Sequence, residues 1–119
     1  MGNAIVHFEI GCKDKDNTKK FYASLFDWQI APHGEAEMIN TGSPEGICGH
    51  ITALGHEPHQ YVTVYAQVDD LEAYLAKAAE LGGKTIVEPV EVPEAGHFAW
   101  LSDPEGNVIG LWKPIAPSS

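Results

Sequence analysis

Two histidines and a glutamate are the side chains of this chain best suited to chemistry. His7 and Glu9 lie two residues apart in residues 4–10, where the intervening positions are apolar. This period of two predicts a half-buried strand that presents both side chains on one face. His50 lies in a second alternating segment, residues 47–54, and is expected to face the same way.

Two imidazoles and a carboxylate form the facial triad that holds non-haem iron in many oxygenases. His7 and His50 are therefore predicted as metal ligands, and Glu9 or Glu37 could supply the carboxylate. Glu9 is also the candidate catalytic base. The alternative is that His7 makes hydrogen bonds in a ligand site that contains no metal.

A second set of candidate residues lies in residues 60–68, which alternate in the same way. Thr63, Tyr65 and Gln67 share one face of this predicted strand, and the same parity places Gly110 and Trp112 opposite them. Aromatic and apolar walls with a few polar groups are typical of small-molecule sites. We therefore predict ligand binding by Thr63, Tyr65, Gln67 and Trp112; the alternative is that these side chains only fill the protein interior.

Helical periodicity appears twice between the predicted strands. Apolar residues recur at helical spacing over residues 21–26, after a polar start at residues 14–17. A second amphipathic stretch, residues 71–81, follows Asp69, which we expect to cap the helix with Glu72 completing a capping box. Further strands are predicted at residues 28–31, 37–41, 84–90, 96–101 and 108–112.

The two halves of the chain repeat one plan. An offset of 56 aligns the first strands and helices, and an offset of 60 aligns the turns at residues 43–46 and 103–106. This predicts an α+β fold of two tandem βαβββ modules, residues 4–54 and 60–113, within a single domain of residues 1–119. The modules would form a cup-shaped curved sheet with the helices on its convex side. A ferredoxin-like βαββαβ sheet is the alternative, but it places fewer strands after each helix.

Composition excludes several classes of partner. The 119 residues carry a net charge of −10 and no arginine, which argues against nucleic acid, because phosphate neutralisation dominates such binding. No apolar stretch approaches the ~20 residues that a membrane span needs. The start of the sequence has no signal-peptide pattern, so we expect a cytoplasmic protein. Unpaired sheet edges favour a homodimer.

Several segments resemble the glyoxalase/bleomycin-resistance/dioxygenase superfamily, also called vicinal oxygen chelate proteins. They are residues 6–10, residues 21–28, the start and end of the second predicted helix at residues 68–71 and 81–83, and residues 103–112 with their Asp-Pro-Glu-Gly-Asn turn. The similarity runs from about Val6 to Trp112 and is greatest to a short branch related to lactoylglutathione lyase.

The resemblance implies a divalent metal, Fe, Ni, Zn or Mn, held by residues of the first and last strand of each module. Those positions fall on His7 and His50 in the first module, and on Thr63 and Gly110 in the second. Thr63 and Gly110 are not competent ligands, so half of the family's metal site is missing. The family would supply lyase, isomerase or dioxygenase chemistry, in which the metal stabilises an enolate-like charge.

Two functions follow as expectations. The first is a protein that binds a small organic molecule in its cup and acts as a metal-dependent enzyme through His7 and His50. The alternative is a non-catalytic, metal-free protein that sequesters its ligand, as bleomycin-resistance proteins do. The histidine pair favours the enzyme, whereas Thr63 and Gly110 favour the binding protein.

Overall fold

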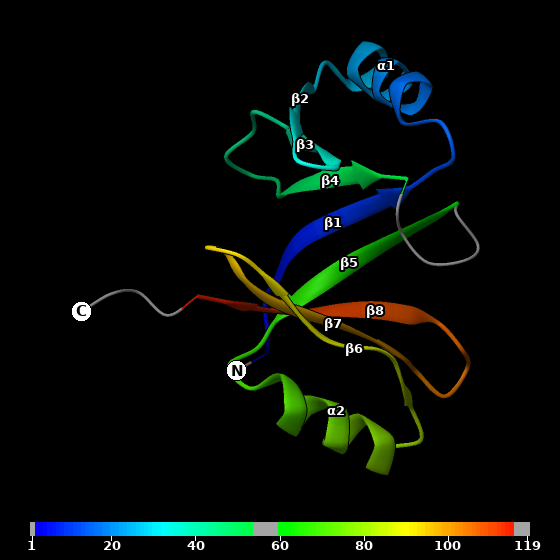
Figure 1. Ribbon diagram of the computed structural model, residues 1–119, viewed down its shortest axis with the longest axis vertical. Coiled ribbons are helices and arrows are strands. Elements are labelled where there is room, and N and C mark those ends of the chain that lie inside the picture. The colour runs from blue at the N-terminus through cyan, green and yellow to red at the C-terminus, as the bar shows by residue number, and fades with distance from the viewer. Residues whose placement is uncertain (1, 54–59, 116–119) are drawn as a thin grey trace. The chain divides into compact units, whose positions relative to one another are not determined.

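The computed structural model describes residues 2–53 and 60–115, so the predicted linker at residues 55–59 lies outside the described residues. The order of strands and helices along the chain is the predicted one, with one strand before each helix and a group of strands after it (Figure 1). The strands are β1 (Ile5–Gly11), β2 (Gln29–His33), β3 (Ala36–Asn40), β4 (Cys48–Thr52), β5 (Tyr61–Gln67), β6 (Lys84–Val92), β7 (Gly96–Ser102) and β8 (Val108–Pro114), and the helices are α1 (Lys15–Phe26) and α2 (Leu71–Glu80).

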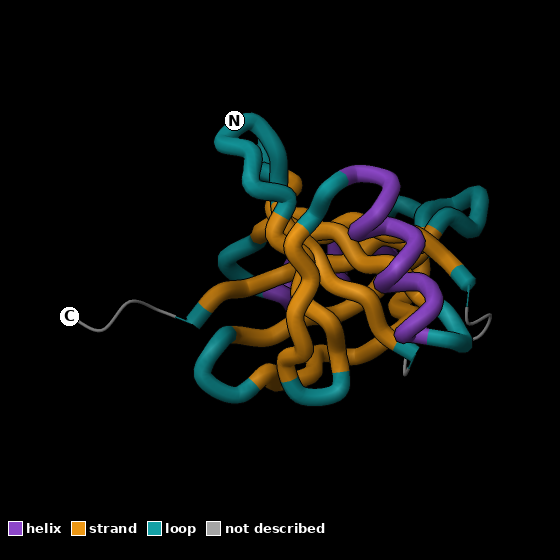
Figure 2. Tube along the Cα trace, turned by 90° about the horizontal axis from the view of Figure 1, so that it is seen from above, coloured by secondary structure: helices purple, strands orange, loops and turns teal. Residues whose placement is uncertain are grey.

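The chain divides into two compact units. The N-terminal unit is Val6–Thr63, and the C-terminal unit combines Val64–Ser119 with Met1–Ile5. Each unit contains several strands and one helix (Figure 2). The module limits predicted from the sequence, residues 4–54 and 60–113, stay a prediction.

The N-terminal unit is a mixed sheet covered on one face by α1. Its strand order is β2-β3-β4-β1, in which β1 and β4 are parallel and the other pairs are antiparallel. Asp14 caps α1, because its carboxylate accepts a hydrogen bond from the Asn17 amide. Ile10, Ile39 and Ile51 form the buried core, and partly buried aromatic side chains of α1 and the following loop pack against them.

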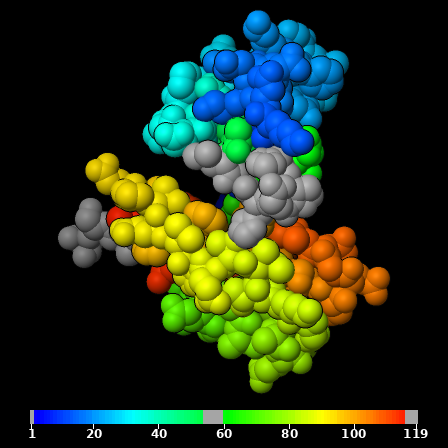
Figure 3. Space-filling view, turned by 45° about the vertical axis from the view of Figure 1, so that its right-hand side comes forward, coloured from blue at the N-terminus to red at the C-terminus, as the bar shows by residue number. Residues whose placement is uncertain are grey.

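The apolar side chains of α1 pack less completely than their spacing predicts. No residue of this helix is fully buried, and Phe21, Leu25 and Phe26 are each more than half exposed. Tyr22 is the α1 side chain that packs against the buried cluster of this unit. The surface of α1 is visible in blue in Figure 3.

The C-terminal unit repeats this arrangement in the order β5-β8-β7-β6. Strands β5 and β8 are parallel, and β8, β7 and β6 are antiparallel. Leu71 and Leu75 of α2 pack on Val68, Ala99 and Leu111 of the sheet. Strand β6 extends beyond the predicted residues 84–90 to Val92, with register shifts between Thr85 and Val90.

Asp70, rather than the predicted Asp69, caps α2. The Asp70 carboxylate accepts from the amide of Ala73, and its backbone is extended, as the cap position requires. The helix begins at Leu71, as predicted, and only the identity of the capping residue differs. The sequence offers two adjacent aspartates, and either one has an amide donor three residues further on.

The two aspartates provide a matched test of this cap. Asp70→Ala is expected to lower the free energy of unfolding by about 1 kcal/mol, because one amide of the first turn loses its acceptor. Asp69→Ala removes the same charge from the neighbouring exposed position and is expected to change stability by less than about 0.5 kcal/mol. Urea denaturation of both variants checks this, and equal losses would contradict the assignment.

The strand pairing of the two units is equivalent. Glu9 pairs with His50 in the first, and Tyr65 pairs with Gly110 in the second. These pairs are related by the offsets of 56 and 60 found in the sequence. Strands β2, β3 and β4 follow α1 before the plan repeats at β5, and β6, β7 and β8 follow α2, so the ferredoxin-like alternative is wrong. Neither α1 nor α2, the helices of the described residues, has the length and hydropathy required to span a bilayer.

Candidate functional site

His7, Glu9 and His50 lie on the same face of the N-terminal sheet, as their parity predicts. In the parallel pairing of β1 with β4, Glu9 is opposite His50, and His7 is opposite Cys48. The other face carries Ile10 and Ile51, which belong to the core beneath α1. The sheet thus has one polar face and one apolar face, and the apolar face packs in the hydrophobic core of the unit.

The polar side chains on this face form a continuous series of polar contacts. His7 Nε2 lies 2.7 Å from His50 Nδ1. The other nitrogen of His50, Nε2, lies 3.3 Å from Glu9 Oε1. Tyr61, the first residue of β5, donates its hydroxyl to Glu9 Oε2. We call His7, His50, Glu9 and Tyr61 the polar series.

The geometry indicates one direction for the protons of the series. If His50 Nε2–H donates to Glu9, the Nδ1 of a neutral His50 is an acceptor. His7 Nε2 must then carry the proton that it shares with His50. In that arrangement each imidazole carries a proton on Nε2, and every donor in the series points toward the Glu9 carboxylate.

Burial favours the uncharged forms at both ends of the series. Desolvation, and secondly the nearby His50, lower the pKa of His7 from 6.5 to about 4, although Glu9 opposes the shift. Desolvation, and then the hydrogen bond to Glu9, raise the pKa of Tyr61 well above its usual range. Near neutral pH, His7 is therefore uncharged and Tyr61 keeps its proton.

These side chains do not converge on one point as metal ligands would. A cation bound by both histidines would lie between His7 Nε2 and His50 Nδ1. Glu9 contacts the other nitrogen of His50, Nε2, so its carboxylate is not directed at that position. A carboxylate in that position orients a histidine instead of binding the metal itself. Among the described residues, no three His, Cys, Asp or Glu side chains are arranged to hold a metal ion. The predicted facial triad does not fit this arrangement.

Glu37 was the other predicted source of the carboxylate, and that prediction is wrong. It pairs with Ile51 on the face covered by α1, where its carboxylate lies 3.1 Å from Lys19 Nζ. His50 pairs with Met38 and therefore lies on the opposite face. Since successive side chains of a strand alternate between faces, Glu37 cannot join His50 without a change of register.

Tyr61 is the member of the series that we did not single out from the sequence. It shares its face with Thr63 by the alternation of β5, and that parity was the available signal. Thr63 is buried, as a residue on this face of the strand should be. Glu9 is also buried, so His7, His50 and Tyr61 are the partly exposed members of the series.

The remaining predicted ligand-binding residues lie in the C-terminal unit. Tyr65 is buried beside Gly110, Trp112 is half-buried, and Gln67 is exposed next to Trp112 in the β5–β8 pairing. Tyr65 leaves no room for a side chain at position 110, because a Cβ there would lie 2.4 Å from carbon atoms of its ring. At Gly110, the position in the second module that the resemblance assigns to a metal ligand, the Tyr65 ring occupies the space of a side chain.

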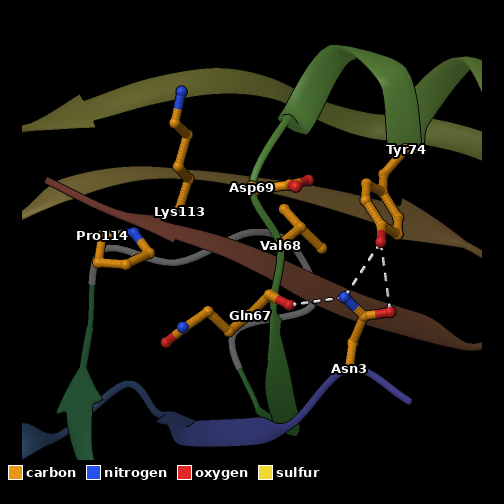
Figure 4. Close-up of a pocket in the computed structure, with 7 residues that line it drawn as sticks. All are labelled: Asn3, Gln67, Val68, Asp69, Tyr74, Lys113 and Pro114. Atoms are coloured by element: carbon orange, nitrogen blue, oxygen red, sulfur yellow. Dashed lines mark hydrogen bonds between the residues drawn. The ribbon is translucent and has the colours of Figure 1, made fainter. Parts of the chain in front are cut away.

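Each unit also has an open cavity. A cavity of about 420 Å³ in the N-terminal unit lies beside the start of α1 and is lined by Cys12, Tyr22, Tyr61 and Val62 among others. A cavity of about 390 Å³ in the C-terminal unit is bordered by Lys113, Asp69 and Gln67 (Figure 4). Asn3 closes one side of the latter by hydrogen bonds to the Gln67 carbonyl and the Tyr74 hydroxyl.

Comparison with known protein families shows the family of this chain. The family model of the glyoxalase-like domain matches residues 6–112, which include most of both units and the whole polar series. The chain belongs to the glyoxalase-like domain family. CFP32 of Mycobacterium bovis, which is provisionally named a glyoxylase, is 51% identical over 87 residues. The match covers 72% of this chain and 33% of CFP32, so this glyoxalase-like chain spans about a third of that relative.

Solved structures show the same fold. A glyoxalase/bleomycin resistance protein/dioxygenase superfamily member from Vibrio splendidus matches with a TM-score of 0.64 at 15% identity, covering 96% of this chain and 100% of that one. Methylmalonyl-CoA epimerase of Streptomyces coelicolor, in complex with 2-nitronate-propionyl-CoA, matches with a TM-score of 0.63 at 19% identity and 98% coverage of both chains. The α+β fold class of this superfamily is thereby established.

Proposed function

We propose that this glyoxalase-like domain binds a small organic molecule at the polar series of its N-terminal unit and needs no metal ion to do so. The observation that carries the proposal is the serial order of the polar contacts, from His7 through His50 and Glu9 to Tyr61. Glu9 accepts from both sides, so it holds His50 and Tyr61 in fixed orientations. A ligand can then meet preorganised side chains without a cation.

The chemistry of the series favours a neutral, oxygen-bearing ligand. The partly exposed imidazoles and phenol offer hydrogen bonds, and no arginine is present to bind a carboxylate or phosphate in bidentate fashion. The buried Glu9 adds negative charge beneath them. Small diols and hydroxyketones, such as catechol and hydroxyacetone, are suitable probes, because their adjacent oxygen atoms can engage two members of the series.

Thermal denaturation in the presence of EDTA tests the proposal. At least one of these probes is expected to raise the melting temperature of the EDTA-treated protein, because binding to the folded state alone stabilises it. His50→Gln and Tyr61→Phe are each expected to remove that increase. His97→Gln, an exposed histidine of β7, is the matched control and should retain it. An increase that appears only after a metal is added would contradict the metal-free site.

A metal-dependent lyase, isomerase or dioxygenase is the second candidate. The 2.7 Å between His7 Nε2 and His50 Nδ1 favours it, because both nitrogens already face each other across a short gap. Glu9 would then remain the predicted base. Elemental analysis after loading with Fe(II), Ni(II), Zn(II) or Mn(II) decides between the candidates. About one retained ion per chain, lost in His7→Ala and in His50→Ala, would replace our proposal with this one.

A further inference from the structure

Four aromatic side chains share one face of the C-terminal sheet. Tyr65 and Trp100 both pair with Gly110, from its two neighbouring strands, so they lie on the same face. Phe98 pairs with Trp112 and is two residues from Trp100, so this second pair lies on that face as well. The opposite face packs on α2 through Ala99 and Leu111. We call Tyr65, Phe98, Trp100 and Trp112 the aromatic face.

Tyr65 and Trp100 form its buried layer. Trp100 Nε1 donates to the Tyr65 hydroxyl at 2.8 Å, so the indole nitrogen has its hydrogen bond within the protein. The Tyr65 ring lies directly over Gly110. Both side chains are about 5% exposed and are therefore fixed in place. This buried layer supports the outer aromatic side chains and contributes little exposed surface of its own.

Phe98 and Trp112 form the outer layer. Both are half-buried, and the Phe98 ring meets the Tyr65 ring edge-on at 84° with centroids 6.3 Å apart. Trp112 lies against Gly96, where an added Cβ would be 3.0 Å from its six-membered ring. Val90, at the edge strand β6, pairs with Phe98 and is 41% exposed. The outer layer is thus a partly exposed aromatic surface backed by a rigid one.

The net charge of the C-terminal unit favours a cation over an anion. Residues 64–115 of the C-terminal unit contain nine aspartates and glutamates, three lysines and no arginine. The faces of indole and phenyl rings carry negative partial charge and attract cations. The unit's excess of carboxylates adds a general attraction for cations and repels anions.

We propose that the outer layer, Phe98 and Trp112, binds a planar aromatic cation by stacking. A flat aromatic ring can stack on either ring, and its positive charge matches both the ring faces and the net negative charge of the unit. The inference builds on the proposed ligand-binding function and names a ligand class for the C-terminal unit. It uses none of the residues of the polar series, so the two proposals can fail separately.

Fluorescence anisotropy of proflavine, a planar aromatic cation, measures the binding. Trp112→Leu and Phe98→Leu are each expected to weaken binding at least tenfold, because they replace a stacking ring by an aliphatic side chain. Phe21→Leu, at an exposed phenylalanine of α1, is the matched control and should bind as the unchanged protein does. These variants all keep the net charge, so a difference between them cannot come from general attraction of a cation to an acidic protein. The planar anion 9-anthracenecarboxylate should bind at least tenfold more weakly than proflavine.

Equal proflavine affinity in Trp112→Leu, Phe98→Leu and the unchanged protein would overturn the inference, as would equal affinity for the cation and the anion. Circular dichroism shows whether each variant is folded, and if one is not, the other decides. Absence of proflavine binding, together with a dimer that dissociates in Trp112→Leu, would mean that a second copy covers the face. Retention of catechol binding in Trp112→Leu, and of proflavine binding in His50→Gln, would show that the two sites are independent.

Discussion

Gly110→Ala is expected to lower the free energy of unfolding by about 3 kcal/mol, at the upper end of the usual cost of overpacking a well-packed site. The added Cβ would lie 2.4 Å from two carbon atoms of the Tyr65 ring. Real Cβ atoms do not approach so closely, so the ring must move. Tyr65 is about 5% exposed and hydrogen-bonded to Trp100, so its movement disturbs the buried layer of the aromatic face. Urea denaturation measures the loss.

Gly46→Ala is the control for this effect. An added Cβ at Gly46 meets its nearest neighbour, Thr41, at an ordinary 3.7 Å, and we expect less than about 1 kcal/mol of change. Tyr65→Leu removes the obstructing ring, so Gly110→Ala should cost less in that background than in the unchanged protein. A loss of equal size in both backgrounds would show that the contact with Tyr65 is not the cause.

Gly110 also bears on metal binding. A histidine at this position would restore the ligand that the family resemblance implies, but it would meet the same ring with a larger side chain. The missing ligand therefore cannot be regained by one substitution. Tyr65 would have to change as well, together with its hydrogen bond from Trp100.

Acid is expected to destabilise the protein through His7 by about 2 kcal/mol between pH 6.5 and pH 4. The pKa of His7 is about 4 in the folded protein, against 6.5 for an ordinary histidine. Above pH 6.5 both states are uncharged at this position, so His7 adds no pH dependence. As the pH falls below 6.5, His7 takes up a proton in the unfolded chain but not in the folded protein. The free energy of unfolding therefore decreases until about pH 4. Water around the partly exposed ring screens the effect, so we expect less than the full shift implies.

The measurement compares the pH dependence of stability in two variants. His7→Gln keeps a hydrogen-bond donor toward His50 but does not titrate, so its stability should decrease less between pH 7.5 and pH 4.5. His33→Gln, at an exposed position of β2, should follow the unchanged protein. Carboxylates titrate in all three proteins, and their contribution cancels in the difference. Parallel curves for His7→Gln and the unchanged protein would contradict the assignment of the effect to His7.

Much of the fold could be predicted from the sequence, because strand alternation and helix spacing are set by burial. The parity that places His7, Glu9 and His50 together depends only on which side of β1 and β4 is apolar. Details that depend on a choice between equivalent neighbours were not predictable. Asp69 and Asp70 satisfy the same capping pattern, and the backbone entering α2 selects Asp70.

The site was predicted less completely than the fold, for a geometric reason. Spacing reveals which face a side chain occupies but not which of its atoms meets a neighbour. His7, His50 and Glu9 are on one face, as expected, yet Glu9 contacts the outer nitrogen of His50 and so breaks the triad. Phe98 and Trp100 lie in the strand predicted at residues 96–101, and only the register with Gly110 and Trp112 groups them with Tyr65.

The equivalent pairing of the two units has a consequence for how such a chain can change over time. The register that holds Glu9 opposite His50 also holds Tyr65 opposite Gly110, so one structural position is present in two copies with different chemistry. A substitution that alters one copy leaves the backbone pairing of the other untouched. The duplicated architecture therefore permits each copy to acquire a new specificity on its own, while the strand pairing of both is preserved.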